Sequence, residues 1–75
     1  METTLLDAKG LKCPLPVLRA RKAMKTIAPG DLLEVHATDP DAPKDFKAFC
    51  ETAGHELLES RSDAGTFVIR IRKSA

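Results

Sequence analysis

The stretch Lys9-Gly10-Leu11-Lys12-Cys13-Pro14-Leu15-Pro16 is the reference point from which the other secondary-structure elements of the chain are assigned. A short apolar run and a glycine precede the cysteine, and two prolines two positions apart follow it. Proline suits the first turn of a helix, because its φ is near the helical value and its missing N–H would have no intrahelical partner there. The stretch therefore predicts a strand end, a loop and a helix start, with Cys13 at the N-cap or in the first turn.

Cys13 is the residue of this stretch that carries chemistry. Pro14 and Pro16 should stiffen its surroundings, and the residue before a proline is biased toward extended backbone, which holds the thiol out of the helix. A helix N-terminus carries partial positive charge, and residues 9–25 contain six lysines and arginines but no acidic residue. Both effects predict a modest lowering of the thiol pKa, which is about 8.5 in a free cysteine. We interpret Cys13 as an exposed nucleophile; the alternative is an inert small apolar residue.

Three basic residues near the thiol are candidates for supporting it or for docking a partner. They are Lys9, Lys12 and Arg19. Each can equally be a solvated surface charge. If they dock a partner, an acidic protein surface would complement them.

The composition is that of a small globular protein. The chain has 75 residues, 43% hydrophobic and 31% charged, and this length suits a single domain over residues 1–75. No run approaches the roughly 20 apolar residues of a membrane span, and the first residues lack signal-peptide features, so we expect a cytoplasmic protein. The two cysteines and two histidines show no zinc-binding spacing, and we expect no structural disulfide and no metal.

The spacing of apolar residues predicts six elements. They are strands over residues 3–8, 31–38, 55–60 and 66–73, a helix over residues 14–27, and a helix that begins near residues 39–43 and ends at Gly54. The order β-α-β-α-β-β predicts an α/β (α+β) two-layer sandwich, in which a four-stranded mixed sheet carries both helices on one face. The two β-α-β passages should each give a parallel pair, and the last two strands an antiparallel hairpin.

Two further predictions concern side chains within these elements. Cys50 falls on the apolar stripe of the second helix, so we interpret it as a core residue; the alternative is a second reactive or resolving thiol. The uncovered face of the sheet should be a mixed polar surface made of Glu34, His36, Arg70 and Arg72. His36 has no evident partner there and is expected to be solvated.

Short motifs are spread along nearly the whole chain. They are Leu6-Asp7-Ala8, Gly10, Cys13-Pro14-Leu15-Pro16, Pro29-Gly30, Asp39-Pro40, Phe49-Cys50, His55-Glu56-Leu57 and Ile71-Arg72-Lys73. Together they resemble the TusA/SirA-like family of small sulfur carrier proteins. A Cys-Pro-x-Pro signature near the N-terminus, ahead of an amphipathic helix in a chain of this length, makes the resemblance specific.

The resemblance implies that Cys13 carries sulfane sulfur as a transient persulfide, with no other cofactor. The donor would be a cysteine desulfurase or another sulfurtransferase. The acceptor would be a protein of tRNA 2-thiouridine synthesis, molybdenum cofactor chemistry or sulfur oxidation. Such a protein is a carrier with sulfurtransferase-type chemistry rather than a stand-alone enzyme, and we expect a monomer that meets its partners transiently.

Two other functional classes stay open at this stage. A thiol redox or regulatory protein could use Cys13 and Cys50, although they lack the Cys-x-x-Cys spacing of such motifs. An RNA-binding module could use the basic first helix. The net charge of +1 and the lack of aromatic residues along the sheet argue against a stable nucleic-acid surface.

Overall fold

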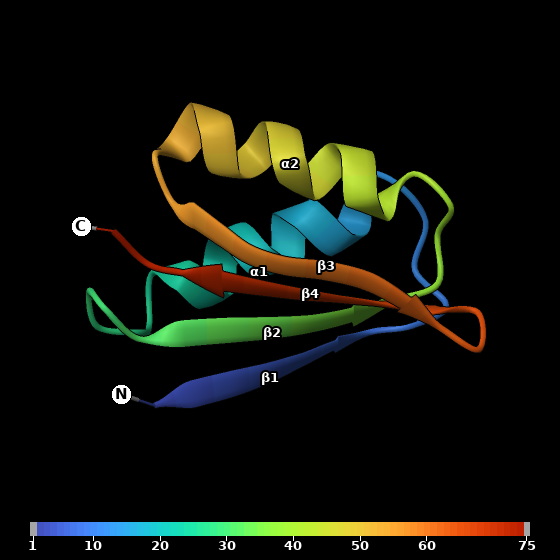
Figure 1. Cartoon of the computed structure of the whole chain (residues 1–75). Helices are drawn as coiled ribbons and strands as arrows, with labels where there is room; N and C mark the ends of the chain where they lie inside the picture. Colours follow the sequence, from blue (N-terminus) through green and yellow to red (C-terminus); the bar gives the residue numbers. More distant parts are fainter. Residues whose placement is uncertain (1, 75) are drawn as a thin grey trace.

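The computed structural model describes residues 2–74 and contains the six elements in the predicted order. They are β1 (Thr3–Ala8), α1 (Leu15–Met24), β2 (Leu32–Ala37), α2 (Ala42–Ala53), β3 (Glu56–Asp63) and β4 (Thr66–Arg72). Figure 1 shows one sheet with both helices on the same side, so the predicted two-layer sandwich is confirmed. Neither helix of this described range is long and apolar enough to cross a membrane.

The strand order in the sheet is β1-β2-β4-β3. β1 and β2 pair in parallel, whereas β4 pairs antiparallel with both β2 and β3. The mixed sheet and the final hairpin are confirmed, but the expected parallel pair between the second and third strands is wrong. Ala64 and Gly65, with φ of 51° and 86°, turn the chain tightly, and β4 returns into the place between β2 and β3.

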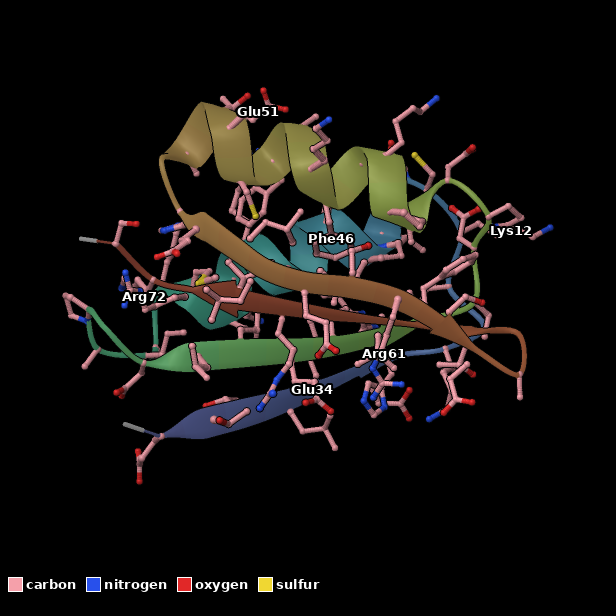
Figure 2. All side chains as sticks on the ribbon, in the orientation of Figure 1. Lys12, Glu34, Phe46, Glu51, Arg61 and Arg72 are labelled. Carbon is pink, nitrogen blue, oxygen red and sulfur yellow. The ribbon has the colours of Figure 1, made fainter. Side chains whose placement is uncertain are left out.

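The core lies between the sheet and the helices. Alternate side chains of β2 and β4 are fully buried there: Leu33, Val35, Ala37, Ile69 and Ile71. Phe46 of α2 belongs to the same cluster, has no exposed surface and points from the helix toward the sheet (Figure 2). Burying a side chain of this size contributes about 1.5–3 kcal/mol relative to leaving it exposed. This layer therefore fixes where α2 sits relative to the sheet.

α1 is shorter than the helix predicted over residues 14–27. Pro14 is its N-cap, so Cys13 lies one residue before the cap, and the predicted cap or first-turn position is wrong by one residue. At the other end, Lys73 Nζ donates a hydrogen bond to the carbonyl oxygen of Met24 at 2.7 Å. This bond satisfies a carbonyl that the end of the helix leaves open, so the chain can leave the helix early.

The uncovered face of the sheet carries the predicted polar residues, joined by a hydrogen bond and by ion pairs. Glu34 Oε2 lies 2.7 Å from His36 Nε2, and Glu34 Oε1 lies 3.2 Å from Arg70 Nε. Arg72 pairs with Glu56. The expectation of a solvated His36 without a partner is therefore wrong, because residues two apart on a strand share a face. Figure 2 shows Glu34 on the side of the sheet away from the helices.

Candidate functional site

Cys13 is exposed on the loop between β1 and α1, as predicted, and the neighbouring loop holds it in place. The Cys13 N–H donates a hydrogen bond to Asp39 Oδ2 at 2.6 Å, and the Gly10 N–H donates one to Thr38 Oγ1 at 2.9 Å. Because β1 and β2 are parallel, their carboxyl ends lie at the same edge of the sheet (Figure 1). The loop after β2 can therefore bond directly to the loop that carries the thiol.

Two prolines build the helix start beside Cys13. Pro14 caps α1 with φ −98° and ψ 17°, after a cis Cys13–Pro14 peptide bond. Pro16 lies in the first turn and is buried, so its ring packs inward at a position where a missing N–H breaks no helical hydrogen bond. The stiffening role assigned to both prolines stays a prediction.

Acidic residues surround the thiol. Cys13 Sγ, a carboxylate oxygen of Asp39 and one of Asp45 lie within 4.8 Å of one another. A hydrogen bond to Asp45, desolvation, and the negative charges of Asp45, Asp39 and Asp41 raise the pKa of the Cys13 thiol to about 11. The predicted lowering is wrong, because the fold brings carboxylates from α2 and the loop before it next to the thiol, and their effect on the pKa exceeds that of the cations of residues 9–25.

Two surface hollows meet at Cys13. The first lies between the loops and is also lined by Gly10, Leu11, Lys12, Thr38, Asp39, Pro40 and Asp41. The second lies between the helices and is also lined by Pro14, Val17, Arg21, Asp45, Ala48, Phe49 and Thr52. In the second hollow the Arg21 guanidinium carbon lies 5.8 Å from the centre of the Phe49 ring, a cation–π contact. The thiol is thus accessible from two sides to a group carried by another macromolecule.

Comparison with known proteins shows which family the chain belongs to. The sequence profile described as Sulfurtransferase TusA matches residues 4–73. The chain belongs to this family. It is 51% identical over 69 residues to the sulfur carrier protein TusA of Allochromatium vinosum, covering 92% of this chain and 91% of the relative. It is 49% identical over 71 residues to the sulfur carrier protein TusA of Pseudomonas putida, covering 95% of this chain and 89% of the relative.

A solved structure shares the fold. The crystal structure of a SirA-like protein from Desulfitobacterium hafniense matches with a TM-score of 0.81 over 100% of both chains, at 27% sequence identity. The predicted fold class and the resemblance to the TusA/SirA-like family are both confirmed.

The structure separates the three cations that were predicted to support the thiol of this TusA-family chain. Lys12 lines the first hollow together with Cys13. Lys9 Nζ lies 3.3 Å from Asp7 Oδ1 and so has an ion-pair partner of its own. Arg19 lines a different hollow, with Leu6 and Lys22. Within the part of the chain that the structure describes, Lys12 is therefore the one of the three cations that lines a hollow beside the thiol. The roles of all three stay predictions.

Sequence reasoning missed three residues that line the site: Arg21, Asp39 and Asp45. The sequence does contain a signal that Asp39 lies near Cys13. Asp39 directly follows the second predicted strand, and if that strand is parallel to the first, the ends of both strands lie at the same edge of the sheet. Asp45 had a weaker signal as the acidic residue of the first turn of α2. Arg21 belongs to the basic run of residues 9–25, but charge alone does not indicate that it faces the hollow between the helices.

Cys13, Asp39 and Asp45 are a group that could hold a metal ion. Asp39 is already engaged, because Oδ2 accepts from the Cys13 N–H and Oδ1 accepts from the Asp41 N–H at 3.3 Å. One soft thiolate with two hard carboxylates is also a poor match to the preferences of a single metal class. The expectation of no metal stays a prediction.

Cys50 lies in the core, as predicted. Its exposed fraction is 3%, and Phe46 and Phe49 belong to the same buried cluster. Burial raises the pKa of its thiol to about 11. A second reactive thiol at the surface is therefore not available from this residue in the folded protein.

Proposed function

We propose that this protein is a sulfur carrier in which Cys13 receives sulfane sulfur as a persulfide and passes it to an acceptor protein. The observation that carries the proposal is the exposed thiol at the meeting point of two hollows, in a chain about half identical to proteins named sulfur carrier protein TusA. The sulfur donor is a cysteine desulfurase or another sulfurtransferase.

Loading is a thiol exchange. The Cys13 thiolate attacks the outer sulfur of the donor persulfide, so that a bond forms between Cys13 Sγ and that sulfur. The bond between the outer sulfur and the donor cysteine breaks, and the donor leaves as a thiolate. The outer sulfur keeps its proton or loses it to solvent, and no external oxidant or reductant is consumed. Delivery repeats the step with an acceptor thiolate as the nucleophile and Cys13 as the leaving group.

The geometry suits a relay between proteins. Cys13 must be reached first by one macromolecule and then by another, and an exposed residue next to two hollows allows both approaches. The bond from the Cys13 N–H to Asp39 limits the motion of the loop, which keeps the sulfur in a defined place for each partner. Cys50 is buried, which supports a carrier over a redox protein that uses both cysteines.

The acceptor belongs to a pathway that uses sulfane sulfur. Synthesis of 2-thiouridine in tRNA, molybdenum cofactor chemistry and sulfur oxidation all consume sulfur in this form, and the protein would enter one of them as an intermediate carrier.

Sulfur loading in vitro tests the proposal. The purified protein is incubated with a cysteine desulfurase and cysteine, and its intact mass is measured before and after treatment with a reducing thiol. We expect the mass to rise by one sulfur atom and to return after reduction. Cys13→Ser should abolish the gain and Cys50→Ala should keep it. A wild-type protein that gains no sulfur, or a Cys13→Ser protein that still gains it, contradicts the proposal.

A further inference from the structure

Carboxylates from two parts of the fold converge on Cys13. Asp45 belongs to the first turn of α2, and Asp39 belongs to the loop between β2 and α2. One oxygen from each lies within 4.8 Å of the other and of Cys13 Sγ. Asp41 lines the first hollow with Asp39 and adds a third negative charge.

The two carboxylates beside the thiol differ in what else they bind. Both oxygens of Asp39 accept backbone N–H groups, from Cys13 and from Asp41, so this side chain fixes the loops. A carboxylate oxygen of Asp45 lies within 4.8 Å of Cys13 Sγ, and Asp45 contributes most to the raised pKa of Cys13. A carboxylate accepts hydrogen bonds and donates none, so it stabilises the protonated thiol and repels the thiolate.

The cations that face the site do not pair with these carboxylates. Lys12 lines the hollow of Asp39, and Arg21 lines the hollow of Asp45. Within residues 2–74, the ion pairs formed by lysine and arginine involve Asp7, Glu34, Glu56, Glu59 and Asp63. The charge of Asp39 and Asp45 therefore acts on the thiol without a neutralising ion pair.

We propose that Asp45, assisted by Asp39, is a positioning residue that keeps the Cys13 thiol protonated in the free protein until the two carboxylates are neutralised. The restraint protects an exposed thiol from stray disulfides and oxidants, which react with thiolates. A cationic side chain of a partner protein would supply the neutralisation during sulfur transfer. That last step rests on the proposed carrier function, whereas the restraint in the free protein does not.

Alkylation of the free protein tests the restraint. The rate of iodoacetamide reaction at Cys13 is measured from pH 7 upward by peptide mass spectrometry, and its midpoint reports the thiol pKa. For the wild type we expect a midpoint of about 11. Asp45→Asn keeps the shape and removes the charge. We expect its midpoint to fall by a unit or more, which is about a tenfold faster reaction near pH 7.5. Asp45→Glu should restore the wild-type profile.

Glu51→Gln is the matched control, because it removes the same charge from the same helix. Glu51 is exposed and lies toward the opposite end of α2 from the loop that carries Lys12 (Figure 2). Its profile should coincide with that of the wild type. If Asp45→Asn also coincides with the wild type, or if Glu51→Gln shifts as far as Asp45→Asn, the restraint by Asp45 is refuted.

A second measurement covers the case in which Asp45→Asn does not fold. Raising the salt concentration of the wild-type protein from about 0.1 M to about 1 M shortens the Debye length from about 10 Å to about 3 Å. Screening of the carboxylates should lower the Cys13 midpoint, and an unchanged midpoint contradicts the proposal. The two proposals can fail independently. If Cys13 loads sulfur but its pKa does not depend on Asp45, only the restraint by Asp45 is refuted. If its pKa depends on Asp45 but Cys13 does not load sulfur, only the carrier function is refuted.

Discussion

Cys13 and Cys50 have similarly raised thiol pKa values, about 11 in both cases, for different physical reasons. Cys13 is exposed and is held protonated mainly by nearby carboxylates, whereas Cys50 is buried and is held protonated by desolvation. A charge can be neutralised by a partner or by a mutation, but desolvation ends only when the core opens. The same pKa therefore describes a thiol that can be activated and one that is inert.

Reactivity should separate the two cysteines most strongly. In the native protein, a thiol reagent should modify Cys13 and leave Cys50 untouched, because reagents reach a buried thiol only through unfolding. We expect a difference in rate of at least about 100-fold, measured residue by residue with peptide mass spectrometry. In denaturant the two rates should converge. Modification of Cys50 at a rate close to that of Cys13 in the native state would remove the distinction.

A substitution at Cys50 should destabilise the protein more than the same substitution at Cys13. Cys50→Ser places a hydroxyl without an assured partner in the core and should lower the free energy of unfolding by about 1–3 kcal/mol. Cys13→Ser changes an exposed residue and should stay within about 0.5 kcal/mol of the wild type. Urea denaturation of both variants measures the difference. Equal losses would mean that Cys13 contributes to packing, contrary to its exposure.

The smallest expected effect concerns the bond that holds the Cys13 loop. Asp39→Ala removes the acceptor of the Cys13 N–H and should cost about 1 kcal/mol, with faster hydrogen exchange over residues 9–16. Asp41→Ala is the control, because the Asp41 side chain makes no capping hydrogen bond at the start of α2. The control should leave exchange in the Cys13 loop unchanged. Equal protection in Asp39→Ala and the wild type would show that the loop is held by other contacts.

Much of the fold could be predicted from local pattern. The alternation of Leu33, Val35 and Ala37 and the helical spacing of Phe46 and Cys50 assign each side chain to a face, and the structure confirms these faces. Exposure of the residue before Pro14 also followed from local backbone preference. These properties depend on neighbours in sequence, so a single sequence contains them.

The electrostatics of the site depended on residues far apart in the chain. Asp39 lies 26 positions after Cys13, and it reaches the thiol only because β1 and β2 pair in parallel. The carbonyl oxygen of Met24 at the end of α1 likewise accepts a hydrogen bond from Lys73, 49 positions later in the chain. The position of β4 between β2 and β3 follows from pairing and not from any local motif. The charges of residues 9–25 alone therefore predict the wrong sign of the pKa shift of the Cys13 thiol.

Direct trapping of the sulfur inside cells is the most decisive test of the account. The protein is produced together with a cysteine desulfurase, alkylated at once on lysis, digested, and analysed by mass spectrometry of the two cysteine-containing peptides. We predict that a fraction of the Cys13 peptide carries the alkyl group through one additional sulfur atom, while the Cys50 peptide never does. A Cys13 peptide found solely as the plain thiol adduct, or an additional sulfur on Cys50, would contradict the account.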